Sequence, residues 1–305
     1  MNVTTTNAIV SGCIVWWEPK AAPAARLREA LEAIGLGDFA PNAETVEAAL
    51  KHALGDYGDM LCKLNRGSTT NGNGEKEKRK YEVKSRLSAS DDGFELVEVT
   101  RRKAGNGYRC EVAVKVDKVT GGLSVIDGWL QGWSVWDLQE KFDEYRSMAT
   151  GASVGRSLVD LTKHLHGTCV RLGGGGNYYL PEDVVGQWSD VIDAYESCSQ
   201  TRVQRMRVVM DDLAARAIRD GITAELLKEG AEVADELAKG DCKEEVIERR
   251  KQRSQELREK CKQYESILND TLVSVHAVLD MADQCAAVAI GVQESGTVFD
   301  ESAFA

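Results

Sequence analysis

Hydrophobic and polar positions alternate with a period of two from Met60 to Asp127, which is the period of a β-strand with one buried face. Val112, Val114 and Val116, for example, fall on the same face of one predicted strand. The alternation predicts an antiparallel meander of short strands near residues 60–65, 81–88, 94–102, 108–117 and 123–127.

The chain before this meander is predicted to form one strand and two helices. Residues 8–17 are rich in β-branched and aromatic side chains, which favours a buried strand. A helix over about residues 22–35 ends at glycines, and a second helix begins at an N-cap, Asn42, and runs to about Leu54. With the meander, these elements predict an N-terminal α+β domain, an antiparallel sheet with two helices, over residues 1–130.

Residues 136–181 show the pattern of helix, turn, helix and hairpin. The second helix, over residues 154–166, has hydrophobic residues three and four positions apart, and Ser153 is placed to cap it. Two strand-like segments separated by the glycines of 173–176 complete the pattern. This order resembles the second half of a winged-helix domain, and the resemblance implies a winged-helix-like domain over residues 131–200.

The winged-helix resemblance implies contacts with DNA. In such domains the second helix lies in the major groove, while the hairpin touches the backbone. Here the resemblance implies nucleic-acid-binding roles for Arg156, Lys163, His164 and Arg171. Winged-helix modules also serve as protein-interaction domains. Residues 136–198 hold ten acidic residues against five Lys and Arg, and this balance favours that second use.

After Pro181, the last proline, hydrophobic positions recur every three or four residues, which is typical of long packed helices. From Val203 the pattern is helical throughout, with a turn near 239–241 and one long helix over about 242–290. We expect an antiparallel helical hairpin or coiled coil over residues 201–291. The long helix carries a seam near heptad spacing, along which the chain could self-associate. The seam residues are Leu257, Tyr264, Leu268, Leu272, Val275 and Leu279.

The composition narrows the class of protein. The 305 residues are 43% hydrophobic and 29% charged, as in globular chains, and the net charge is −11. That charge argues against nonspecific coating of nucleic acid, because phosphate contacts need clustered Lys and Arg.

Eight cysteines without a Cys-x-x-Cys pair favour reduced thiols and a cytoplasmic location. No run approaches about 18 apolar residues, so no membrane-spanning helix is expected. The acidic tail over residues 292–305 is expected to fray.

Candidate motifs for catalysis or cofactor binding fail on their spacing. The glycines of 67–72 are spaced as in a phosphate-binding loop, but residues 73–74 are Asn-Gly where that motif needs Lys and a hydroxyl. His164 and His166 are two positions apart on a predicted helix and do not share a face, so we expect no metal site with Cys169. We therefore expect no metal and no cofactor, and we infer no small-molecule ligand.

Three tryptophans, Trp129, Trp133 and Trp136, follow the last predicted strand of the meander. They form either an aromatic binding surface or an anchor that joins the sheet to the helical part. Buried tryptophan commonly contributes packing, so the anchor is the preferred interpretation.

These features together predict an α+β protein in three parts with a function in assembly. The preferred interpretation is a non-enzymatic scaffold or adaptor that binds protein partners through its long helices. The alternative is a nucleic-acid-associated protein that binds DNA through the winged-helix-like segment. A third interpretation is an enzyme housed in the N-terminal domain near Trp16, Trp17 and Glu18.

Overall fold

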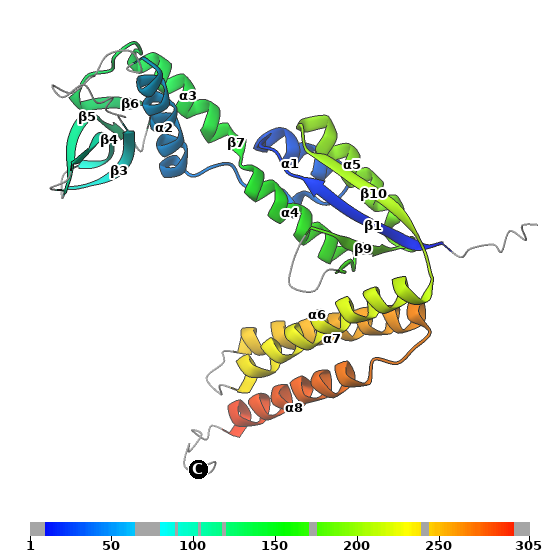
Figure 1. The fold of residues 1–305 in the computed structure, drawn as a ribbon. Coiled ribbons are helices and arrows are strands. Elements are labelled where there is room, and N and C mark those ends of the chain that lie inside the picture. Colours follow the sequence, from blue (N-terminus) through cyan, green and yellow to red (C-terminus); the bar gives the residue numbers. More distant parts are fainter. Residues whose placement is uncertain are drawn as a thin grey trace, which may run out of the picture. The chain divides into compact units, whose positions relative to one another are not determined.

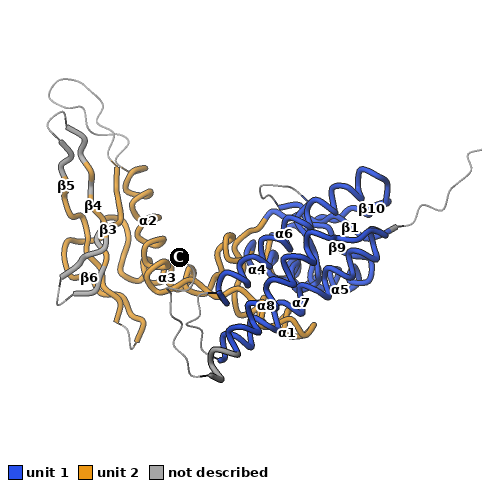
Figure 2. The backbone as a smooth tube through the Cα atoms, turned by 90° about the horizontal axis from the view of Figure 1, so that it is seen from below, with its two compact units in different colours: residues 1–18, 155–197, 201–305 blue, residues 19–154, 198–200 orange. Residues whose placement is uncertain are grey.

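The computed structural model describes residues 10–64, 80–88, 91–102, 105–117, 120–170, 176–238 and 244–295 (Figure 1). It contains both helices and antiparallel sheets, so the predicted α+β class is confirmed. The chain divides into two compact units (Figure 2). Unit 1 contains residues 1–18, 155–197 and 201–305, and unit 2 contains residues 19–154 and 198–200.

Unit 1 contains a four-stranded antiparallel sheet whose strands come from distant parts of the chain. In spatial order they are β10 (Arg202–Val209), β1 (Val10–Glu18), β9 (Tyr178–Pro181) and β8 (Thr168–Cys169). β1 confirms the predicted N-terminal strand. Because β1 pairs with β9 on one side and β10 on the other, the N-terminal strand lies in the same unit as the C-terminal helices. The units therefore differ from the expected consecutive domains, 1–130, 131–200 and 201–291.

The prediction of continuous helix from Val203 is wrong at its start. Residues Arg202–Val209 form the edge strand β10, which pairs antiparallel with β1 along its whole length. The hydrophobic spacing allowed a helix, and valine favours a strand. The pairing with β1, far away in the sequence, decides between the two.

The segment from α3 (Val135–Ser147) through β9 has the predicted two helices followed by a hairpin, but the predicted turn at 149–152 is wrong, because Met148–Ala149 form a short strand and the second helix already begins at Gly151. β8 and β9 pair as the expected hairpin, and β9 also pairs with β1, so it is an inner strand of the sheet. After it come a 3-10 turn, Glu182–Val184, and helix α5 (Val185–Cys198). The winged-helix resemblance itself stays a prediction.

Helix α4 (Gly151–His164) is the second helix of this segment. Its predicted hydrophobic stripe is buried, and its residues are Val154, Leu158, Leu161 and, just beyond the helix, Leu165. The N-cap is Thr150, not Ser153, because the Thr150 hydroxyl accepts a hydrogen bond from the Ser153 N–H at 3.0 Å. The helix therefore begins about three residues earlier than the sequence indicated.

The C-terminal part of unit 1 is a bundle of three helices, α6 (Asp212–Ala238), α7 (Glu244–Leu268) and α8 (Val273–Ser295) (Figure 1). The predicted single helix over 242–290 is wrong, because it is broken after Leu268. Asn269 has a left-handed φ of 48°, and the Asp270 N–H donates to the Glu265 carbonyl at 3.2 Å. This is the bond pattern of a Schellman helix end, in which asparagine tolerates positive φ. The predicted turn at 239–241 lies outside the described residues.

The seam predicted for self-association lies in the interior of this bundle. Five of its six residues are at most 4% exposed, and Leu268 packs partly buried against the same core. The buried five are Leu257, Tyr264, Leu272, Val275 and Leu279. The heptad-like spacing thus serves contacts among α6, α7 and α8 of one chain, and self-association along it stays a prediction.

Unit 2 contains a second four-stranded antiparallel sheet with two helices packed against it (Figure 1). The strands, in spatial order, are β3 (Lys80–Ser88), β4 (Asp91–Arg102), β5 (Gly105–Val116) and β6 (Leu123–Gly128), which confirms four of the five predicted strands. The packing helices are α2 (Val46–Leu64) and α3. The shorter elements are α1 (Ala24–Ala33), the 3-10 turn Gly37–Phe39, and the paired β2 (Ala22–Pro23) and β7 (Met148–Ala149).

Two predictions for α2 are wrong. Residues 60–64 are its last turn rather than a strand, because Tyr57 and Leu61 continue the buried helical face of the preceding turns. The N-cap is Thr45 rather than Asn42, since the Thr45 hydroxyl accepts from the Ala48 N–H at 3.2 Å.

Candidate functional site

The residues predicted to bind nucleic acid do not form one basic surface. Arg156, Lys163 and His164 lie on α4 and are exposed, while Arg171 lies outside the described residues. Lys163 Nζ lies 3.5 Å from Glu229 Oε1 on α6, so its charge is directed to an acidic group of the chain itself. Asp160 is exposed on the same helix and lowers its positive charge further.

Lys163 lines a charged cavity of about 380 Å³ formed by α4, α6 and α7 in unit 1. Its lining residues are Lys163, Glu225, Lys228, Glu229, Glu232, Val233, Arg250 and Arg253. Arg253 donates a hydrogen bond to Glu229, and Lys228 Nζ lies 3.9 Å from Glu232 Oε1. Both acidic and basic side chains line the cavity, which therefore offers no surface of a single charge.

A buried lysine, Lys260 on α7, joins the bundle to the sheet beside this cavity. Its side chain is almost completely enclosed, and Nζ donates to the Gly167 carbonyl at 2.8 Å and to Glu225 Oε1 at 2.6 Å. Glu225 Oε2 accepts from the Thr168 hydroxyl at 2.8 Å. Burial lowers the pKa of Lys260, although the nearby Glu225 carboxylate opposes that shift. This network attaches α6 and α7 to the start of β8.

Glu229 is the carboxylate on which two basic side chains of unit 1 converge. Burial, the largest single effect, raises its pKa, but the charge and hydrogen bond of Arg253 and the charge of Lys163 together outweigh burial. The pKa of Glu229 is therefore lower than its ordinary value. The carboxylate stays ionised at neutral pH and acts as a structural acceptor.

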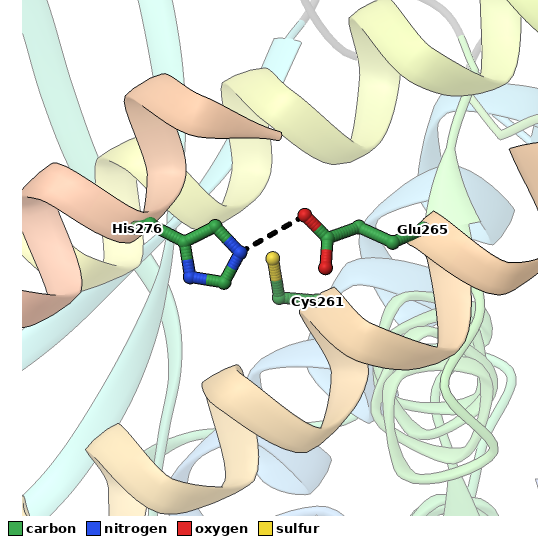
Figure 3. Close-up of side chains that lie close together, drawn as sticks. All are labelled: Cys261, Glu265 and His276. Carbon is green, nitrogen blue, oxygen red and sulfur yellow. Dashed lines mark hydrogen bonds and ion pairs between the residues drawn. The ribbon is translucent and has the colours of Figure 1, made fainter. Parts of the chain in front are cut away.

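Three side chains of metal-ligating type converge at the corner between α7 and α8 (Figure 3). Cys261 and Glu265 are four residues apart on α7, so they share one face, and His276 comes from the first turn of α8. Their ligating atoms all lie within 4.8 Å of one another. The sulfur of Cys261 lies between the imidazole and the carboxylate in Figure 3.

Hydrogen bonds hold the carboxylate of this corner in place. Glu265 Oε1 lies 2.9 Å from His276 Nε2 and accepts from the Leu272 N–H at 2.7 Å. Cys261 is fully buried, and burial raises the pKa of its thiol to about 11. Glu265 therefore has a structural role in the corner whether or not an ion is bound.

This cluster could not be predicted from ligands that are close in sequence, because Glu265 and His276 are eleven residues apart. The hydrophobic spacing also predicted one continuous helix over residues 261–276. On such a helix His276 would lie more than 20 Å from Cys261, at about 1.5 Å per residue. Asn269 and Asp270, which favour left-handed turns and helix caps, were the available signal for a corner.

The three tryptophans after β6 have different environments. Trp133 packs against Tyr57 with the ring centroids 5.5 Å apart, so it is the anchor that was expected. Trp129 and Trp136 are 70% and 77% exposed, and the anchor interpretation is wrong for these two. Leu64 at the end of α2 is 62% exposed, and a Cβ at Gly132 would lie 3.5 Å from its Cδ1. Residues 129–136 therefore carry two exposed tryptophans, and the exposed Leu64 lies beside this segment at Gly132.

Trp17, one of the three strand residues considered for an enzyme site, takes part in packing. The ring of Trp17 stacks on Tyr178 at a centroid distance of 5.1 Å and an interplanar angle of 7°. Trp188 of α5 lies against the same ring at 6.1 Å. Trp17 is thus part of an aromatic cluster between β1, β9 and α5.

Helix α8 contains a stretch, Val273–Ile290, that is long and apolar enough to cross a membrane by length and composition alone. A core helix of a soluble protein meets the same criteria. In unit 1 this stretch supplies Val275, Leu279 and Ala282 to the interior of the bundle. The expectation of no membrane partner stays a prediction.

One protein family matches almost the whole chain. Residues 12–294 match the model of a protein family described as a family of unknown function, DUF6744. The comparisons with curated proteins and with solved structures gave no match.

Proposed function

The chain belongs to the DUF6744 family, and we propose that it is a non-enzymatic scaffold that binds a protein partner through residues 129–136. We call this segment the Trp connection. It leads from the end of β6 into the first turn of α3. The observation that carries the proposal is the exposure of two large aromatic side chains, Trp129 and Trp136, at 70% and 77%.

An exposed tryptophan is well suited to bind another protein. Tryptophan is enriched among the few residues that contribute most of the binding energy of protein interfaces, and contiguous apolar patches on a surface mark interaction sites. Val135 and Leu64 add further exposed apolar surface at the same end of α2 and α3. A partner that covers these side chains would remove several large apolar groups from water at once.

The Trp connection is also held in a fixed conformation. The Ser134 hydroxyl accepts from the Asp137 N–H at 3.2 Å and the Asp137 carboxylate accepts from the Ser134 N–H at 2.6 Å, which makes a capping box. The Gln131 N–H donates to the Tyr57 hydroxyl at 2.6 Å. Gly132 has a left-handed φ of 74°, which favours glycine. A partner therefore meets a preorganised surface, and less entropy is lost on binding.

The long helices support this role less directly than the sequence indicated. The seam expected to bind partners is buried within the chain's own bundle, so its apolar groups already have a contact. We therefore assign the partner contact to the Trp connection of unit 2 and a structural role to the bundle.

The test is capture of partners by the tagged full chain from extracts of the source cells. The variant is the double substitution Trp129→Ser and Trp136→Ser. A matched control is Leu213→Ser with Val273→Ser, which replaces apolar residues of similar exposure, 76% and 71%, in unit 1. We expect the partner's affinity to fall at least about tenfold for the Trp variant and to stay unchanged for the control. Equal capture by both variants would contradict the proposal.

A second candidate function, association with nucleic acid, is favoured by the edge strand β10. Arg202, Arg205 and Arg207 are exposed on this strand, which makes it a basic feature of an acidic chain. The test is the fluorescence anisotropy of labelled duplex and single-stranded DNA across a salt series. Binding that weakens steeply with salt would support this function, and no binding at low salt would remove it.

A further inference from the structure

We infer that Cys261, Glu265 and His276 form a binding site for a zinc ion at the corner between α7 and α8 (Figure 3). The site lies in the bundle of unit 1 and does not depend on the partner contact proposed for unit 2.

The three side chains match the ligand chemistry of zinc. Zinc binds cysteine sulfur, histidine nitrogen and carboxylate oxygen, and it does so with four ligands in a tetrahedron. Hard cations such as magnesium and calcium prefer all-oxygen sites, so the thiol and the imidazole favour zinc over them.

The ligating atoms lie close to the positions that a zinc ion requires. With bonds of about 2.0–2.3 Å, the ligands of a tetrahedral zinc lie roughly 3.5 Å apart. The present atoms all lie within 4.8 Å, and the pair Nε2 of His276 and Oε1 of Glu265 is already at 2.9 Å. The upper limit of 4.8 Å exceeds the tetrahedral spacing by about 1 Å, so shifts of the side-chain ends by about this amount would bring the three atoms to zinc distance.

The corner allows an ion and a fourth ligand to enter. Cys261 is fully buried, but the side chains of His276 and Glu265 are 35% and 20% exposed. A water molecule can therefore complete the tetrahedron from the solvent side. The neighbouring cation, Arg258, is paired with Asp280 at 2.7 Å and with Asp283, so its repulsion of the ion is largely neutralised.

The proton and charge balance of binding is simple. The thiol of Cys261 loses its proton to solvent as the sulfur–zinc bond forms. The proton that His276 Nε2 donates to Glu265 moves through solvent to Nδ1, so the imidazole stays neutral while Nε2 and Glu265 Oε1 exchange their hydrogen bond for bonds to the ion. One thiolate and one carboxylate then neutralise the two charges of Zn²⁺. No oxidant or reductant takes part. Because a proton is released, affinity should rise with pH.

A bound ion would connect α7 to α8 and so stabilise the corner between them. Cys261 and Glu265 belong to the last turns of α7 and His276 to the first turn of α8, so the ion bridges the break at Asn269. Any ligand that binds only the folded state stabilises it by mass action. The melting temperature of the full chain should therefore rise with zinc and return with a chelator.

The experiment is a titration of the metal-free full chain with Zn²⁺ by calorimetry, and with Co²⁺ as a spectroscopic probe. Co²⁺ bound to a thiolate gives a charge-transfer absorption that oxygen and nitrogen ligands do not give. The test variants are Cys261→Ser, His276→Gln and Glu265→Gln, the last of which keeps an acceptor for the Leu272 N–H. The controls are Cys285→Ser, also on the bundle, and His52→Gln, whose ring pairs with Glu44 at 2.9 Å without a thiol.

The proposal expects one ion per chain and a thiolate band with Co²⁺. It also expects at least about a tenfold loss of affinity in each test variant, with the controls unchanged. His276 is partly exposed, so its variant tests the site even if the buried Cys261→Ser substitution disturbs folding. Zinc affinity that is the same in the parent and in His276→Gln would overturn the proposal, as would a Co²⁺ complex without the thiolate band.

Discussion

The bundle of unit 1 and the sheet of unit 2 are stabilised by different kinds of contact. The described core of unit 2 is a cluster of aliphatic and aromatic side chains, within which the Tyr57 hydroxyl reaches the Gln131 N–H. The bundle has an apolar interior too, but it also encloses charge. Lys260 is 6% exposed and Glu229 is paired with Arg253 and Lys163.

The two kinds of contact differ in how strictly they determine the arrangement of the helices. Apolar burial stabilises in proportion to area and has little directional preference. A buried charge is tolerated only with its partner in the right place. We infer that the Lys260 network fixes α6 and α7 against the start of β8 and that the Glu229 network fixes them against α4, while the core of unit 2 mainly supplies stability.

The largest expected effect comes from removing one partner of a buried pair. Lys260→Met removes the cation beside the Glu225 carboxylate and the side-chain donor to the Gly167 carbonyl, and it should lower the free energy of unfolding by about 3–5 kcal/mol. Leu54→Ala in the core of unit 2 should lower it by a similar amount, about 2–5 kcal/mol, by leaving a cavity.

A second substitution separates these two causes. Lys260→Met combined with Glu225→Leu removes both charges and should recover much of the loss, whereas a cavity at Leu54 has no such rescue. Urea denaturation measures the free energy of unfolding of each variant, and hydrogen exchange shows in which unit the stability is lost or recovered. A double variant as unstable as the single one would show that the bundle depends on lysine packing and not on the charge pair.

The next effect concerns pH and should be confined to the bundle. The folded-state pKa of Glu229 is lowered, so its stabilisation is present above the ordinary pKa and is lost as pH falls through the folded-state value. Glu229→Gln should therefore lower the free energy of unfolding by about 1.5–3 kcal/mol at neutral pH, and the difference should vanish in acid. The effect of Leu54→Ala should be the same at both pH values. Unfolding curves between pH 7 and acid check this, and a constant loss from Glu229→Gln would contradict it.

The smallest effect is expected at the left-handed turns, where the two units should behave alike. Asn269 in unit 1 and Gly132 in unit 2 both have positive φ, at 48° and 74°. Asn269→Ala and Gly132→Ala should each lower stability by about 1–2 kcal/mol, because a Cβ disfavours this conformation. Asn269→Gly should cause no such loss. Thermal unfolding of the three variants is sufficient, and a stabilising Asn269→Ala would be inconsistent with the helix end described above.

The elements that the sequence predicted correctly are those set by local pattern. Strands β3 to β6 follow from alternation, and the stripe of α4 follows from helical spacing. β10 could not be predicted in this way, since its residue Val209 pairs with Val10, almost 200 residues away in the sequence. The corner at Asn269 was readable from its residue types, but the continuous heptad-like seam on both sides favoured one helix.

The candidate sites depended on these errors. His276 meets Cys261 only because of the corner, so the metal-ligating cluster was hidden by the predicted long helix. The exposure of Trp129 and Trp136 could not be predicted either. A sequence shows that tryptophans are close together, but which of them finds a partner such as Tyr57 depends on the tertiary fold.

The central claim is that a partner binds the Trp connection rather than the long helices, and site-specific photo-crosslinking tests it most directly. A photoreactive amino acid would replace Val135, which is 41% exposed next to Trp136, in one full-length protein and Met281, which is 48% exposed on α8, in another, so that both tryptophans are kept. The account predicts a crosslinked partner from position 135 and none from position 281. Crosslinks from position 281 alone would contradict it and return the partner contact to the helical bundle.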